Sequence, residues 1–169
     1  SRKPPPERSS FNSLTYANRA VSNVGHVAGE WIEIKLTEDS GACESVMPRD
    51  GPCIGIPILP SYQSRNGIDY EVANSATIPC LGERHLEIWT EGATAPRMMA
   101  IQVADVHKPL LSLSACADVG YESRLGKYFG YLLDSVTSDT IPLEREGNLY
   151  TLRAWVRAAP INLREPQSS

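Results

Sequence analysis

The chain is divided into short apolar runs, and this division limits most strongly the folds that it can adopt. Its 169 residues include 12 glycines and 13 prolines, which interrupt the apolar runs before any reaches the length of a long helix. From residue 30 to residue 157 the runs are short and are bounded by turn-forming residues. We therefore expect one all-β domain over residues 30–157.

The clearest strand follows from alternation in the run that begins at Trp31. Ile32, Ile34 and Leu36 alternate with charged residues, which predicts one face on a core and one face toward water. Gly120 would end a short helix over residues 111–119. Further strands are expected at 70–73, 86–90, 98–106 and 149–156, the last after a turn at 146–148.

The two ends of the chain differ from the middle in composition. Residues 1–29 are rich in Pro and Ser and show no sustained period, so we expect an extended N-terminal arm, and residues 158–169 are expected to form a C-terminal tail. No apolar run is long enough to cross a bilayer. An intracellular location is expected, and an organellar one stays open because the first residue is not Met.

Charge and side-chain spacing argue against several classes of function. The formal net charge of −4 does not favour a nucleic-acid partner. The three histidines are widely separated and the four cysteines form no Cys-x-x-Cys pair, so neither a metal site nor any other cofactor is expected. Reduced thiols are the simpler interpretation, although disulfides stay open. Nucleophile-elbow and phosphate-loop motifs are not found in the sequence.

A tetrapeptide of a different kind follows the first predicted strand. Asp39-Ser40-Gly41-Ala42 has the form Asp-[Ser/Thr]-Gly-[Ala/Ser/Thr], which suits the catalytic loop of an aspartic peptidase. Asp39 would supply the carboxylate, Ser40 an outward hydrogen bond, and Gly41 a close approach of backbone. A polar turn after a strand is the alternative interpretation of so short a motif.

Three later segments are similar to segments of a known protein family, and they follow the tetrapeptide in the same order as in that family. Residues 70–76, 103–114 and 141–152 are similar to the flap hairpin, the Val-x-Asp-Val segment and the closing hairpin of copia-type retrotransposon proteases. The chain thus resembles a retropepsin-like aspartic protease domain, either active or domesticated. The resemblance implies a pepsin-like closed β-barrel with one short helix, and a substrate-covering flap that includes Ala73, Asn74, Ser75 and Ala76.

The resemblance also implies a mechanism that needs two carboxylates. Two such groups about 3 Å apart share one proton, so that one acts as base on water and the other as acid on the substrate carbonyl. Asp134 and Asp139 lack the following Gly and are interpreted as turn residues. A catalytic chain must therefore form a homodimer that brings both copies of Asp39 together.

Three positions depart from the pattern of the family. Glu38 precedes Asp39 where relatives usually have an apolar residue, and burying its charge would be costly without a partner. Ser75 replaces a common Gly, which would matter if the position requires a positive φ. Ser112 stands where retroviral relatives have Gly. The interrupted apolar stretch at 51–60 would line a substrate cleft or partner surface, or else cover one end of the barrel.

Two functions therefore remain at this point. The first is an aspartic endopeptidase that acts as a homodimer on a peptide or protein substrate. The second is a non-catalytic, retrotransposon-derived domain that serves as a structural or adaptor subunit, with the neighbouring subunits of a larger protein complex as its partners. The fold is common to both functions, so it does not separate them.

Overall fold

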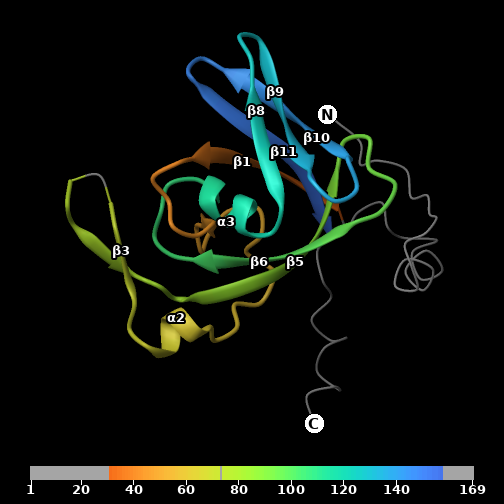
Figure 1. Ribbon diagram of the computed structural model, residues 1–169. Helices are drawn as coiled ribbons and strands as arrows, with labels where there is room; N and C mark the ends of the chain where they lie inside the picture. Colours follow the sequence, from red (N-terminus) through yellow and green to blue (C-terminus); the bar gives the residue numbers. More distant parts are fainter. Residues whose placement is uncertain (1–30, 73, 158–169) are drawn as a thin grey trace, which may run out of the picture.

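The computed structural model describes residues 31–72 and 74–157, which form mostly β-structure (Figure 1). The predicted arm and tail lie outside these residues. The strands are β1 (Trp31–Asp39), β2 (Val46–Met47), β3 (Asp69–Glu71), β4 (Thr77–Pro79), β5 (Gly82–Thr90), β6 (Arg97–Val103), β7 (Leu110–Ser112), β8 (Tyr121–Leu125), β9 (Phe129–Asp134), β10 (Thr140–Glu146) and β11 (Leu149–Arg157). The described helices are α2 (Tyr62–Arg65) and α3 (Leu113–Asp118).

Nine of these strands form one sheet with the order β1-β7-β2-β6-β5-β11-β10-β9-β8. Strand β11 also pairs antiparallel with β1, from Trp31 opposite Arg157 to Thr37 opposite Thr151. The order of pairing from β1 through β7, β2, β6, β5 and β11 thus returns to β1. Strand β7 runs parallel to the end of β1 and lies between β1 and β2, which flank the Asp39 loop.

The alternation predicted for β1 is present, and it sets which side chains enter the core. Ile34 and Leu36 are buried in the main apolar cluster, whereas Lys35 is exposed. The same cluster contains buried aliphatic residues of β5, β6, β10 and β11, together with Cys53 and Ile56 from the loop before α2. Burial of these side chains supplies the main driving force for folding.

A second, smaller apolar cluster contains all three tryptophans. Trp89 and Trp155 are opposite each other on β5 and β11 and are buried, and Trp31 packs against them. The rings of Trp31 and Trp89 meet edge to face with centroids 6.3 Å apart. The guanidinium of Arg157 lies 4.7 Å from the centre of the Trp31 ring. The three tryptophans are thus packing residues.

A buried arginine fixes the loop that follows β2. Arg84 on β5 is only 1% exposed, and it donates hydrogen bonds to the carbonyl oxygens of Ile56 (2.8 Å), Pro48 (3.0 Å) and Arg49 (2.8 Å). Burial lowers the pKa of Arg84 below the usual arginine value. The guanidinium satisfies three main-chain acceptors in a segment that lacks regular structure.

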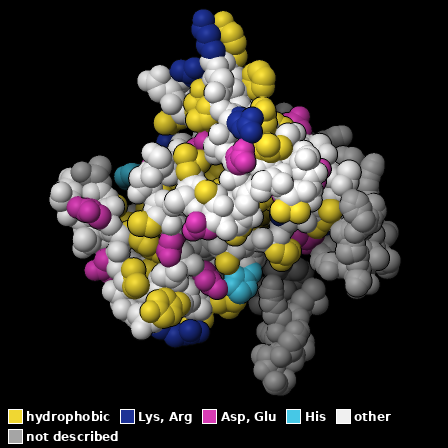
Figure 2. Space-filling view, viewed as in Figure 1, with side chains coloured by type: hydrophobic (Ala, Val, Ile, Leu, Met, Phe, Trp, Pro, Cys, Tyr) yellow, Lys and Arg dark blue, Asp and Glu magenta, His cyan; other side chains and the backbone are white. Residues whose placement is uncertain are grey.

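Two hairpins extend from the body of the molecule (Figure 1). Strands β3 and β4 form a separate two-stranded sheet, and β8 and β9 form a long hairpin at the end of the main sheet. Figure 2 shows hydrophobic side chains beside Lys or Arg at the far end of the β8–β9 hairpin. The exposed apolar residues of this end are Leu125, Tyr128 and Phe129.

The all-β prediction is confirmed, and the details differ from it in places. The predicted helix at 111–119 is α3, but its first two residues belong to β7. The expectation of one helix is wrong, because α2 forms a single turn closed by a capping box between Ser61 and Ser64. The turn at 146–148 joins β10 to β11, with Gly147 at a φ of 66°.

The two helices within the described residues, α2 and α3, are short. Neither α2 nor α3 has the length or the apolar content that a membrane-spanning helix requires.

Replacing Arg84 with Met should lower the free energy of unfolding by about 3 kcal/mol, because the carbonyl groups of Ile56, Pro48 and Arg49 would lose a common donor that is itself buried. Urea unfolding followed by tryptophan fluorescence measures this loss. Arg49→Met is the matched control, since the Arg49 side chain is exposed in the same loop. A loss below about 1 kcal/mol for Arg84→Met would show that the loop does not depend on the guanidinium.

Candidate functional site

Asp39 is the last residue of β1 and begins the loop to β2. Strand alternation places its side chain on the same face as Thr37 and Lys35, opposite the core face. The backbone N–H of Gly41 donates to Asp39 Oδ1 at 2.8 Å, and Oδ2 has no hydrogen-bond partner in residues 31–72 and 74–157. The first oxygen is therefore held by the loop and the second remains available to a water molecule or another carboxyl group.

Gly41 permits this close approach. A Cβ atom on Gly41 would lie 3.3 Å from Asp39 Oδ1, which is tighter than most contacts of real Cβ atoms. Ser40 is exposed, and its hydroxyl makes no hydrogen bond to the described part of the chain. Ala42 is partly buried and its N–H approaches the carbonyl oxygen of Asp39 at 3.4 Å. The tetrapeptide forms a tight turn with the Asp39 carboxylate fixed at its start.

Ser112, at the end of β7, supports this loop from behind. It pairs with Asp39 in the parallel register and is fully buried. Its hydroxyl donates to the carbonyl oxygen of Ala42 at 2.8 Å and accepts from Ala115 N–H at 3.1 Å, so it also caps the N-terminus of α3. Its own N–H donates to Ser45 Oγ at 2.9 Å. The serine thus supplies side-chain bonds that a Gly at this position could not make.

Glu44 connects the loop to two elements that are distant in the sequence. Its carboxylate accepts 2.6 Å hydrogen bonds from the Tyr70 hydroxyl on β3 and from Gln63 Nε2 on α2. Burial, and then the hydrogen bond to Glu44, raise the pKa of Tyr70 far above its usual value. The base of the β3–β4 hairpin is therefore tied directly to the loop that contains Asp39.

The turn of this hairpin contains three of the four predicted flap residues. Asn74, Ser75 and Ala76 are exposed, and Ala73 lies outside the described residues. Ser75 has a φ of 69°, the left-handed conformation that favours Gly. Its N–H donates to the carbonyl oxygen of Val72 at 2.9 Å, which closes the turn. Position 75 thus has a positive φ, and a Ser in place of Gly is strained in this conformation.

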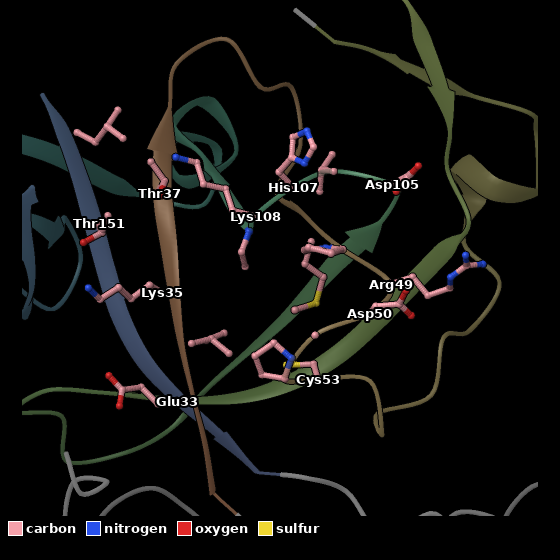
Figure 3. Close-up of a pocket in the computed structure, with 18 of the residues that line it drawn as sticks. Glu33, Lys35, Thr37, Arg49, Asp50, Cys53, Asp105, His107, Lys108 and Thr151 are labelled. Carbon is pink, nitrogen blue, oxygen red and sulfur yellow. The ribbon is translucent and has the colours of Figure 1, made fainter. Parts of the chain in front are cut away.

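A groove of about 740 Å³ lies along the outer face of β1 (Figure 3). Glu33, Lys35 and Thr37 form one side, and the segments 47–53 and 105–109 form the other. Asp39 is outside its lining but follows Thr37 on the same face. Within the stretch 51–60, residues 51–53 line the groove, while Cys53 and Ile56 pack into the core.

Glu38 points to the opposite face and is half buried. It accepts a hydrogen bond from Ser123 Oγ at 3.1 Å, while its Oε1 is buried with no hydrogen-bond partner in the described chain. Burial raises the pKa of Glu38, an effect that the Ser123 bond only partly offsets. Burial together with the Glu38 charge raises the pKa of Cys116 to about 11. Glu38 therefore places a carboxyl group with only one hydrogen-bonded oxygen directly beside the candidate site.

The remaining candidates for chemistry are separated in the structure. All four cysteines are free, with Cys53 and Cys80 buried. Across the described residues, no group of three His, Cys, Asp or Glu side chains has the arrangement of a metal site. His85 contacts Glu83 at 2.7 Å and His107 lines the groove, whereas His26 lies outside the described residues. Asp134 accepts N–H bonds from Val136 and Thr137, as a turn residue does.

Sequence reasoning identified the Asp39 loop and the hairpin but did not identify the contact between them. Glu44, Gln63 and Tyr70 carry no local pattern that marks them as partners, because only the fold brings them together. The groove residues on β1 were visible only as the polar half of an alternating strand.

Replacing Ser75 with Gly should raise the free energy of unfolding by about 0.5–1 kcal/mol, because Gly adopts a positive φ without steric cost. Chemical denaturation measures the change. Ser138→Gly, at a φ of 71°, should behave alike, whereas Ser40→Gly should not stabilise, since Ser40 does not have a positive φ. Equal effects at all three positions would contradict the assignment of strain to Ser75.

The raised pKa of Glu38 makes the stability of the domain depend on pH in a defined direction. The folded state binds this proton more tightly than the unfolded chain, so the stability contributed by protonated Glu38 is fully present below the unfolded pKa and is lost as the pH rises through the higher folded pKa. Glu38→Gln should remove this part of the slope. Unfolding free energies measured from pH 4 to pH 8 would contradict the account if both proteins showed the same slope.

A scan of the chain against models of known protein families gives no match, and a search of curated proteins likewise finds no matching sequence.

Proposed function

We propose that the chain is a retropepsin-like aspartic endopeptidase domain of the copia-type retrotransposon kind, which acts as a homodimer on peptide bonds. The observation that carries the proposal is the setting of Asp39. Its carboxylate is oriented by Gly41 N–H through one oxygen, in a loop supported by Ser112 and linked through Glu44 to a protruding hairpin. A general acid–base carboxylate needs this combination of a fixed orientation and a free oxygen.

The pairing of strands supports the finer fold that this proposal implies. The order β1-β7-β2-β6-β5-β11 returns to β1, as a closed β-barrel requires. The position of β7 between the two strands that flank the Asp39 loop agrees with the segment 110–112 being the counterpart of the apolar-apolar-Gly segment of retroviral relatives. The β3–β4 hairpin would be the flap.

The mechanism follows from two such loops facing each other. In the homodimer the free Oδ2 atoms of both Asp39 residues would share one proton, because two adjacent negative charges are costly. The ionised group would take a proton from water as it attacks the scissile carbonyl, and the protonated group would donate to the carbonyl oxygen. An extended substrate would lie beneath the hairpins, with the groove along β1 at its side.

The second candidate is a non-catalytic domain that serves as a structural or adaptor subunit. The incompletely paired carboxyl group of Glu38 favours it, because this position next to Asp39 departs from the family. In that function Asp39 would be a loop residue without a carboxyl partner. The protein would then lack peptidase activity although it is stably folded.

Asp39→Asn should reduce cleavage of a peptide library by at least about 1,000-fold at pH 4–7, because an amide cannot act as the base of the pair. Asp139→Asn is the matched control, since Asp139 is exposed in the loop between β9 and β10. Mass spectrometry of the products measures cleavage, and circular dichroism checks folding. Equal cleavage by the wild type and by folded Asp39→Asn, or none by either, would contradict the endopeptidase proposal.

A further inference from the structure

One edge of β6 is paired over only part of its length. The strand pairs along all of Arg97–Val103 with β5, but on its other edge β2 pairs only with its last two residues. Gln102 N–H donates on this second edge, to the carbonyl oxygen of Ser45 at 3.0 Å. Because bonding alternates along the strand with a period of two, the N–H and C=O groups of Met98 and Ala100 point the same way. They form no main-chain hydrogen bond on this edge within the described residues.

A cavity of about 440 Å³ opens beside this unpaired edge. It lies between β6, α3 and the beginning of β8, which are neighbours in Figure 1. Its inner wall consists of buried aliphatic side chains of the main core, among them Leu36, Leu111 and Leu132. Its rim carries Met98, which is 70% exposed, and Val119, which is 71% exposed. An apolar side chain that entered the cavity would thus leave water for the core of the domain.

Arg97 marks one end of this cavity and carries unused hydrogen-bond donors. Its Nε donates to the Tyr121 hydroxyl at 2.8 Å, and its guanidinium lies 5.9 Å from the centre of the same ring. The two Nη groups form no hydrogen bond or ion pair within the described residues. Asp134 attracts Arg97 electrostatically, but the hydrogen bonds to its Oδ1 come from the N–H groups of Val136 and Thr137. The guanidinium is therefore held in place by Tyr121 and keeps donors for a carboxylate.

The opposite end of the cavity is acidic. Glu44 lines it there, next to Ser45, which bonds to the other end of β6. Both Glu44 oxygens already accept hydrogen bonds, one from Tyr70 and one from Gln63. A ligand carboxylate would be attracted by Arg97 and repelled by Glu44, so an acidic group belongs at the Arg97 end of the cavity.

We propose that this edge and cavity bind an extended peptide that carries an apolar residue and, two positions away, an acidic residue. The peptide would add a strand to β6, with its main chain bonded to Met98 and Ala100, its apolar side chain in the cavity and its carboxylate on Arg97. The spacing follows from alternation, because Arg97 and Met99 share a face with the buried Ile101, and a strand places every second side chain on one face. A small apolar molecule could fill the cavity but could not pair with the edge.

This surface is separate from the Asp39 carboxylate. The cavity is lined by Leu36 from the core face of β1, whereas the Asp39 side chain lies on the opposite face of that strand. Peptide binding at β6 uses none of the groups assigned to proton transfer. The inference therefore goes beyond the proposed function and does not rest on it.

Two labelled peptides test the proposal in the full chain carrying Asp39→Asn, which prevents cleavage. Fluorescein-labelled Thr-Thr-Glu-Thr-Leu-Thr-Thr and Thr-Thr-Leu-Thr-Glu-Thr-Thr cover both strand directions. At least one should bind with a Kd below about 1 mM, measured by fluorescence anisotropy. Replacing the Leu by Ser, or methylating the three central backbone nitrogens, should raise Kd about ten-fold or more, because the first empties the cavity and the second blocks strand pairing. No measurable binding of either peptide, or a Kd that methylation leaves unchanged, would overturn the proposal.

A cavity-filling variant locates the bound peptide. Ala115→Leu should fill the cavity from α3 and raise Kd about ten-fold or more. Ala117→Leu is the matched control, because Ala117 is exposed on the same helix and does not line the cavity, and its Kd should equal that of the parent chain. Thermal unfolding checks that both variants are folded. Equal Kd values for the two folded variants would contradict binding in this cavity.

A charge variant tests the position of the carboxylate. Arg97→Gln should abolish the preference for the Glu peptide over the same peptide with Gln, which should be about five-fold or more in the parent chain. Arg124→Gln is the matched control, since Arg124 is exposed on β8 outside the cavity lining and should leave the preference intact. A preference for Glu that persists in folded Arg97→Gln would show that Arg97 does not bind the acidic side chain.

Discussion

The arrangement of the candidate site depends on the buried hydroxyl of Ser112. It donates to the Ala42 carbonyl and accepts from the first turn of α3, while its backbone N–H reaches Ser45 across the loop. A single residue thus joins β7, the Asp39 loop and a helix. Buried polar groups that satisfy one another in this way hold a loop in one conformation. The orientation of the Asp39 carboxylate is a consequence, because Gly41 N–H is placed by the same turn.

The sequence predicted those elements whose signal is local. Alternation predicted β1, a Gly-containing turn predicted the β10–β11 hairpin, and the residues near 111–119 predicted α3. Strand β7 has three residues and pairs in parallel with a strand distant in the chain, so periodicity could not mark it. Strand β8 is largely polar because it lies at an edge. The Tyr70–Glu44 bond and the burial of Glu38 arise from tertiary packing, which no short window of sequence contains.

The described chain contains half of what the proposed chemistry needs. Asp39 has one oxygen held by the loop and one oxygen without a partner, and no other carboxyl group of residues 31–72 and 74–157 forms a hydrogen bond with it. The loop that contains Asp39 is tied to the β3–β4 hairpin through Glu44, and the groove along β1 begins two residues before Asp39, at Thr37. Under the proposed function, each would act together with its counterpart in a second copy.

The most direct test of this dependence is to mix wild-type protein with an increasing excess of Asp39→Asn at constant wild-type concentration, after the subunits have exchanged. If each active unit needs two intact Asp39 residues, the activity per wild-type chain should fall in proportion to the wild-type fraction, because mixed dimers are inactive. Activity that stays constant as the variant is added, while heterodimers are shown to form, would contradict the account.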